Sequence, residues 1–268
     1  MPASRSPSRD TSPLRPARSI WPWVLIGLAA VMAVVVAALP ASLISHFLPP
    51  SVHAEDFSGS LWHGSAGAIR VNASDAGALE WRLEPAALLR LAMTADLHWV
   101  KVGFVVNGTV TVDRGGFSAH DVSGGGPIED LRDFGVAAGW RGNADVHFSM
   151  LKGDFARLSA AVGEITVSNL VSAQVANGAD LGGYDLRFPE GAVSADGSLD
   201  SELTDIGGPL QIQARIRFSP AERTGLLSGT LKERAGFPPA LASQLDSLAQ
   251  LRGRDREGRI PVDLEFKF

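Results

Sequence analysis

The chain of 268 residues contains no cysteine. This absence excludes a disulfide framework, a zinc-thiolate site and a thiol nucleophile. With 45% hydrophobic and 20% charged residues, the composition is that of a globular protein long enough to bury a sizeable core. One large domain is the simplest organisation.

Sequence motifs of common catalytic and cofactor sites are also missing. The chain has no GxxxxGK(S/T) phosphate loop, GxGxxG dinucleotide turn, HExxH metal pair or GxSxG nucleophile elbow. The acidic stretch 195–203 lacks the central glycine and terminal glutamate of a calcium loop. The histidines are scattered without helical metal-ligand spacing: His46, His53, His63, His98, His120 and His147. We therefore predict that the protein is not an enzyme and holds no metal and no cofactor.

Positive charge is scarce beyond the N-terminus. Residues 1–40 hold four of the 24 basic residues and one of the 29 acidic residues, which leaves 20 basic and 28 acidic residues and a formal charge of −8 for the remainder. A surface of this charge repels phosphate groups. Nucleic acid is therefore not expected as a partner.

Charged side chains are absent from the whole stretch 19–54, and its most apolar part is the run 20–39. A helix of this length spans a bilayer core about 30 Å thick. Arginines that include Arg15 and Arg18 precede the run, and this positive-inside bias predicts a cytoplasmic N-terminus. Trp21 and Trp23 stand at the start of the span, where indole rings anchor at the membrane interface. The sequence thus predicts a single transmembrane anchor.

A cleaved signal peptide is the rival interpretation, with cleavage within 38–42 or 51–56. The apolar run exceeds the usual length of a signal-peptide core, which favours an uncleaved anchor. The predicted segments are a disordered cytoplasmic tail over 1–19, the anchor over 20–39, a linker over 40–56 and a β-rich domain over 57–268. The tail is rich in Pro, Ser and Arg, and the linker contains Pro49 and Pro50, which would space the domain from the membrane.

Beyond residue 50 the hydrophobic pattern has a period of two. In the stretch 210–218 apolar and polar residues alternate strictly, and 260–268, 79–83, 144–150 and 184–188 repeat the pattern. Such alternation indicates strands with one buried and one wet face, which is typical of antiparallel sheets. Short helices are expected at 84–91, 126–134 and 238–251, each with a proline near its first turn. The predicted fold class is mainly β, with a largely antiparallel sheet and a few short helices.

Six short motifs in fixed order resemble the type II secretion system protein N family. They are GSLWHG, ALEWRLEPAALLRL, DLGGYDLRF, DIGGPL, FPPALASQLDSL and DREGRIPVDLEF, and they run from Gly59 almost to the end of the chain. The matching positions that we expect to be architectural are Gly59, Leu61, Trp62, Gly64, Trp81, Pro85, Gly183, Tyr184, Asp205, Gly208, Pro209, Leu210, Gly258 and Arg259.

The resemblance implies a non-enzymatic, single-pass inner-membrane component of the machinery that exports folded proteins through an outer-membrane secretin. Its C-terminal domain would lie in the periplasm. Its partners would be the secretin and the inner-membrane platform proteins. The family is similar to AsmA-like proteins, which implies a curved sheet, so a lipid-binding or lipid-conducting role is the alternative.

Two residues of these motifs carry structural expectations of their own. Trp62 lies between two glycines, and we expect it to sit on the first strand and to anchor the core, beside Trp81. Asp205 precedes the Gly208–Pro209 turn and is placed to accept backbone N–H bonds there.

Overall fold

The computed structural model describes residues 34–35, 38–72, 74–134, 136–154, 157–173 and 178–267. The chain divides into two compact units, Met1–Leu39 and Pro40–Phe268. The predicted tail, most of the predicted anchor and the residues Arg15, Arg18, Trp21 and Trp23 lie outside the described residues. Within the described ranges, no helix has the length and apolar character needed to cross a bilayer.

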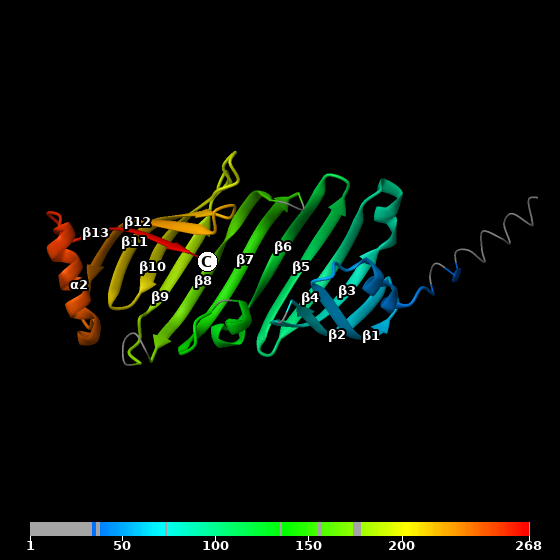
Figure 1. The fold of residues 1–268 in the computed structure, drawn as a ribbon, viewed down its shortest axis with the longest axis horizontal. Coiled ribbons are helices and arrows are strands. Elements are labelled where there is room, and N and C mark those ends of the chain that lie inside the picture. Colours follow the sequence, from blue (N-terminus) through cyan, green and yellow to red (C-terminus); the bar gives the residue numbers. More distant parts are fainter. Residues whose placement is uncertain are drawn as a thin grey trace, which may run out of the picture. The chain divides into compact units, whose positions relative to one another are not determined.

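The second unit is built around one antiparallel sheet of thirteen strands, each paired only with its neighbours in sequence (Figure 1). This confirms the predicted mainly β, antiparallel fold. The strands are β1 (Val52–Gly59), β2 (His63–Val71), β3 (Ser74–Glu84), β4 (Met93–Lys101), β5 (Phe104–Asp113), β6 (Gly116–Pro127), β7 (Trp140–Gly153), β8 (Leu158–Ser172), β9 (Gly183–Phe188), β10 (Leu199–Gly207), β11 (Leu210–Ser219), β12 (Thr224–Glu233) and β13 (Ile260–Lys267).

In the part of the chain that the structure describes, four helical segments accompany the sheet. The 3-10 helices η2 (Pro85–Arg90) and η3 (Ile128–Phe134) and the α-helix α2 (Pro239–Arg252) lie where helices are predicted. Pro85 and Pro239 occupy the first turns, where a missing N–H costs nothing. The fourth segment, the 3-10 helix η1 (Ala41–Phe47), has no counterpart in the sequence prediction.

The segment 40–56 differs from the linker that the sequence predicts. It contains η1 and the first residues of β1, and Ala41 is 1% exposed in a cluster with Trp81. Pro40 forms a bridge with Ser60. Small and apolar side chains in this segment are thus buried against the first strands, a tertiary effect that the prolines and the lack of charge do not reveal.

One register row of the sheet is apolar across all thirteen strands. Each of its residues pairs with the next: Phe57, Ala66, Leu79, Trp99, Val106, Gly124, Val146, Ile165, Leu186, Leu203, Ala214, Gly229 and Val262. Because side chains alternate along a strand, these residues share one side of the sheet, which we call the apolar face.

The adjacent row is polar over the same thirteen strands. Its members are Ser58, Ser65, Glu80, His98, Asn107, Ser123, His147, Glu164, Arg187, Glu202, Arg215, Ser228 and Asp263. They define the polar face. Arg187 lies 3.5 Å from Glu164 across the strands, so charges of opposite sign alternate in part of this row.

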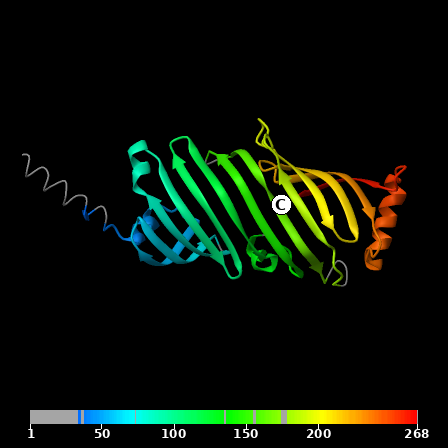
Figure 2. The same ribbon diagram turned by 180° about the vertical axis from the view of Figure 1, so that it is seen from behind.

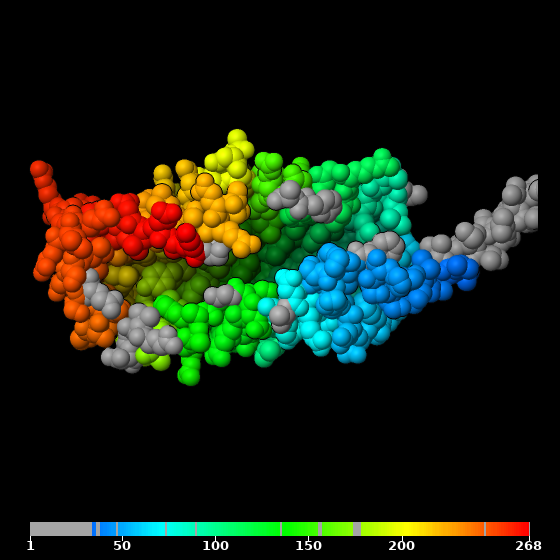
Figure 3. All heavy atoms as spheres, in the orientation of Figure 1, coloured from blue at the N-terminus to red at the C-terminus, as the bar shows by residue number. Residues whose placement is uncertain are grey.

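The apolar face is only partly covered by the chain's own elements. In Figure 1, η1 with β1–β2 lies in front of the sheet at one end, β12–β13 lie in front of it at the other end, and η3 lies in front of the middle strands, whereas Figure 2 shows the middle strands from behind without such cover. Three clusters of buried residues form on this face, around Trp81, Phe104 and Phe148. The space-filling view shows a hollow between β12–β13, η3 and β1–β2 (Figure 3).

The last strand departs from the predicted burial. Ile260 and Val262 are 0% and 2% exposed, but Leu264 and Phe266, which follow on the same face, are 54% and 37% exposed. Phe266 contacts the ring of Phe218 edge-on at 6.2 Å. The alternation of residue types correctly predicts on which face of the sheet each residue of β13 lies. Whether a residue is buried also depends on which elements cover that face, and only the first residues of β13 are covered.

We predict that the burial of an apolar side chain in β13, and not its hydrophobicity alone, determines how much it contributes to the stability of the domain. Ile260→Ala should lower the free energy of unfolding by about 2–5 kcal/mol, because it leaves a cavity. Leu264→Ala should change it by no more than about 0.5 kcal/mol. Chemical denaturation of the two variants measures both values, and equal destabilisation would contradict the burial of this strand.

Candidate interaction surface

The GSLWHG motif forms the turn between β1 and β2. Gly59 has a φ of +79°, and a Cβ there would lie 2.4 Å from the carbonyl oxygen of His63. A Cβ on Gly64 would lie 2.8 Å from Cζ2 of Trp81. The carbonyl oxygen of Ser60 would be nearer still, at 2.6 Å. Both glycines are therefore required by close approach to the backbone of the turn, and Gly64 also by its approach to an aromatic ring.

Trp81, not Trp62, is the anchor of this region. Trp81 is 6% exposed, its Nε1 donates to the carbonyl oxygen of Leu61 at 2.9 Å, and its ring meets Phe57 edge-on at 6.4 Å. Trp62 lies in the bend after β1 and is half-buried, and its carbonyl oxygen accepts the N–H of Leu83 at 2.7 Å. This corrects the expectation that Trp62 sits on the first strand, because the chain reverses at residues 60–62 before β2 begins.

The motifs DLGGYDLRF and DIGGPL meet at one place in the sheet, which we call the Asp205 junction. The carboxylate of Asp205, only 6% exposed, accepts the backbone N–H of Ile212 at 2.9 Å and forms an ion pair with Arg234. A Cβ on Gly208, which has a φ of +114°, would lie 2.6 Å from Cα of Gly182. The connection before β9 and the turn before β11 are therefore in direct contact.

Pro209 and Leu210 of the motif DIGGPL complete the Asp205 junction. Pro209 is buried, and its carbonyl oxygen accepts the N–H of Arg234 at 2.7 Å, while Leu210 begins β11. The expectation that Asp205 accepts a backbone N–H agrees with the structure, although the donor, Ile212, belongs to the strand and not to the turn. The role of Arg234 was not predicted, since it is 29 residues away in sequence.

Tyr184 and Gly183 belong to the same region. Gly183 is buried at the start of β9, and the hydroxyl of Tyr184 donates to the carbonyl oxygen of Leu181 at 2.9 Å. Burial raises the pKa of Tyr184, and the negative charges of Asp205 and Asp180 raise this pKa further. The phenol is therefore a neutral hydrogen-bond donor at physiological pH. Its side chain lines an apolar hollow of about 390 Å³, together with Ile128, Val136, Ala137, Trp140, Val167 and Leu170.

The first residues of the motif DREGRIPVDLEF form a tight loop before β13. Asp255 accepts the backbone N–H groups of Glu257 and Arg259, each at 2.8 Å, and pairs with Nε of Arg259 at 2.9 Å. The backbone N–H of Arg259 and then its side chain lower the pKa of Asp255. Gly258 has a φ of +75°, which a glycine adopts without strain. Arg254 ties this loop to Glu233 at 3.1 Å, next to the Asp205 junction.

The motif residues thus lie in two separate regions. Gly59, Gly64 and Trp81 hold the turn between β1 and β2, and exposed Pro85 begins η2 nearby. Asp205, Gly258 and their neighbours lie around the ends of β10 and β12. Their shared property is the fixing of turns and connections, and they form no single reactive site.

The two edges of the sheet differ in their protection. β1 is interrupted at Asp56, which has a φ of +56° and no partner in the β1–β2 register, and η1 packs against this strand. At the other edge, no strand within the described residues pairs with the outer side of β13; α2 contacts this strand, with Arg252 lying 3.7 Å from Asp263, but residues 263–267 are exposed. Leu264 and Phe266 of β13 are also exposed. An unprotected edge with apolar side chains can accept a strand from another chain.

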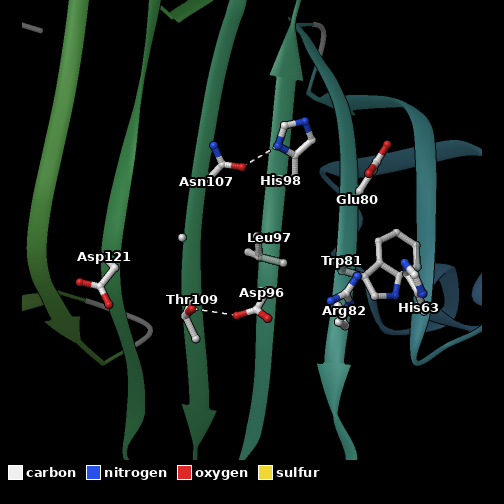
Figure 4. A pocket seen from close by; sticks show the side chains of 11 residues that line it. His63, Glu80, Trp81, Arg82, Asp96, Leu97, His98, Asn107, Thr109 and Asp121 are labelled. Atoms are coloured by element: carbon white, nitrogen blue, oxygen red, sulfur yellow. Dashed lines mark hydrogen bonds between the residues drawn. The ribbon is translucent and has the colours of Figure 1, made fainter.

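The polar face carries a shallow hollow of about 350 Å³ across β2–β6 (Figure 4). In it, Nδ1 of His98 lies 2.6 Å from Oδ1 of Asn107, and Thr109 donates to Asp96 at 2.8 Å. Both contacts join β4 to β5 and thus support the sheet. Within the described part of the chain, no group of three or more histidine or acidic side chains is placed to hold a metal ion.

We predict that Trp62 of the first turn and Trp81 of β3 contribute unequally to stability. Trp81→Ala should cost about 3–5 kcal/mol through lost burial and a cavity. Trp62→Ala should cost clearly less, since Trp62 is half-buried in a bend. Thermal and denaturant melts of both variants test this order, and a larger loss for Trp62→Ala would contradict the assignment of the anchor.

No curated protein and no solved structure matches the chain. The family model of type II secretion system protein N matches residues 50–263, which include all thirteen strands except the last four residues of β13. The chain therefore belongs to the type II secretion system protein N family.

Proposed function

We propose that this component of the type II secretion system is a non-enzymatic scaffold, anchored in the inner membrane with its sheet in the periplasm. The single observation that carries the scaffolding role is the unpaired and exposed end of β13 after Val262, in contrast to β1, which is interrupted at Asp56. The partners expected at this edge are the other secretion components, namely the secretin or the inner-membrane platform proteins.

The chemistry of β13 favours addition of a partner strand after Pro261. Pro261 has no N–H to donate, so a partner would pair with the later part of the strand. In this part Leu264 and Phe266 lie on the apolar face, whereas Asp263 and Glu265 alternate with them. Backbone hydrogen bonds would supply affinity, and a partner with apolar and basic side chains in the matching alternation would gain specificity.

We predict that a photo-reactive amino acid at Leu264 captures a secretion component in cells that assemble the machinery. The same probe at Asp56, on the opposite edge, is the matched control and should capture much less. Mass spectrometry of the crosslinked species identifies the partner. Equal capture from both edges, or capture of no secretion component at Leu264, would argue against the β13 edge.

A second candidate function is lipid binding on the apolar face. It is favoured by the apolar hollow beside Tyr184 and by the open trough between the end strands (Figure 3). An acyl chain would bury apolar surface that the chain's own elements leave uncovered. A photo-reactive probe at Ala137, in the wall of the hollow, distinguishes this role, because lipid adducts support it and adducts with protein alone do not.

The proposed topology rests on the charge-free run 20–39 and the arginines before it. We predict high alkaline phosphatase activity for a reporter fused after Phe268 and low activity for one fused at the N-terminus, since this enzyme matures only outside the cytoplasm. A reporter that requires the cytoplasm should show the reverse. The opposite pattern would overturn the topology.

A further inference from the structure

The end of β13 forms one continuous exposed surface. Residues 263–267 are consecutive in this strand, and all of them are exposed. Leu264 and Phe266 lie on the apolar face, whereas Glu265 and Lys267 lie on the polar face, because side chains alternate along a strand. In the space-filling view, β13 stands at the rim of the hollow (Figure 3). This end of the strand therefore offers a backbone edge, an apolar face and a charged face to one and the same partner.

The charged face of this surface carries both signs. Within the described residues, neither Glu265 nor Lys267 forms an ion pair. The two residues are two positions apart in one strand, which separates their Cα atoms by about 7 Å. Asp263, the next charged residue toward α2, already has Arg252 at 3.7 Å. An incoming strand would satisfy both free charges if it placed a basic side chain opposite Glu265 and an acidic one opposite Lys267.

A second copy of β13, running antiparallel, meets this requirement in one register. When Phe266 lies opposite Phe266 of the second copy, Glu265 faces Lys267 on both sides of the two-fold axis. A register centred on Glu265 sets the two Glu265 carboxylates against each other and draws Lys267 toward Asp263, which already has Arg252 beside it. The next register sets Asp263 against Glu265 twice. Since like charges directly opposite each other are destabilising, the strand is self-complementary only about Phe266.

The net charge of the domain opposes this pairing only at long range. Residues 41–268 hold 20 basic and 28 acidic residues, a formal charge of −8, so two copies repel each other at a distance. The Debye length at physiological ionic strength is about 8 Å. Opposite Cβ atoms in paired strands lie about 4.5–5.5 Å apart, so the charge pairs across the axis act within this distance. The paired segment is short, and we therefore expect a weak and reversible dimer.

We propose that β13 pairs with β13 of a second copy of this chain, antiparallel and centred on Phe266, until a secretion component takes the edge. This inference rests on the proposed function of the β13 edge and adds its regulation, since the edge pairs with one strand at a time. An exposed apolar edge promotes uncontrolled association, which natural proteins prevent by covering the edge. The second copy supplies this cover, and a partner strand with basic side chains opposite both Asp263 and Glu265 would replace it.

The absence of cysteine allows a direct test on the full chain in detergent micelles, without other secretion components. Phe266→Cys should give a disulfide-linked dimer on mild oxidation, because opposite Cα atoms in antiparallel strands lie about 4.5–5.5 Å apart, within disulfide reach. Glu265→Cys and Lys267→Cys should each link poorly alone but should link to each other when chains with tags of different size are mixed.

The control for random collision is Leu251→Cys, whose parent side chain is 83% exposed on α2. It should remain monomeric under the same oxidation. Equal dimer yields from Leu251→Cys and Phe266→Cys would overturn the proposed pairing.

A charge exchange tests the same register with Phe266 in place. This matters because the ring also packs on its own sheet, where a Cβ on Gly225 would lie 2.3 Å from Cζ of Phe266. Glu265→Lys should weaken the dimer about tenfold in sedimentation equilibrium, since two attractive pairs become repulsive. Adding Lys267→Glu to this variant should restore the dimer. A wild-type chain that stays monomeric, or equal association of all three chains, would overturn the inference.

A measurement in cells separates this inference from the proposed function. Lys267→Glu places two acidic side chains opposite each other in the dimer but keeps the edge attractive to a basic strand. The photo-reactive probe at Leu264 should therefore capture more of a secretion component and less of the second copy in this variant. Capture of the second copy alone would contradict the proposed function and support the pairing. Capture of a secretion component, with no disulfide at position 266 in the purified chain, would overturn the pairing and support the proposed function.

Discussion

A single-layer sheet of thirteen strands must keep one face apolar without a second layer to enclose it. The unbroken apolar row from Phe57 to Val262 meets this constraint, because any slip of one residue in a strand would exchange its two faces. Glycine and alanine occur in this row where adjacent strands leave no room for a larger side chain. A Cβ on Gly229 would lie 2.5 Å from that of Ala214 on the adjacent strand. Apolar patterning and close backbone approach together therefore determine the register of the sheet.

Much of this fold could be predicted from the alternation of residue types. The stretch 210–218 is β11, and Ile212, Ala214 and Ile216 are buried as their positions indicate. Burial at the end of β13 could not be predicted in this way, since it depends on elements distant in sequence. The same applies to η1 and to the pairing of Asp205 with Arg234, which only the assembled sheet brings together.

The first motif shows why a residue's neighbours in sequence are an unreliable guide to its role. Glycines beside Trp62 indicated a strand entry, but Gly64 lies against both the backbone of the turn at Ser60 and the ring of Trp81, which belongs to the next strand. The indole N–H of Trp81 then bonds to the turn at Leu61. The period-two pattern of residues 79–83 contained the correct signal, because it places Trp81 on the apolar side of a well-defined strand.

The pairing of every strand with its sequence neighbours alone has a consequence for folding. Most hairpins close short loops, so the contact order is low for a β protein of this size, and pairing can start at several hairpins and spread in both directions. The connection 234–259, which contains α2, is the longest, so β13 joins the sheet through a long loop. Opening can begin at an end of the sheet without disturbing the middle strands. In such a chain the last strand can detach and re-form locally, so a partner strand could compete for its place while the rest of the domain stays folded.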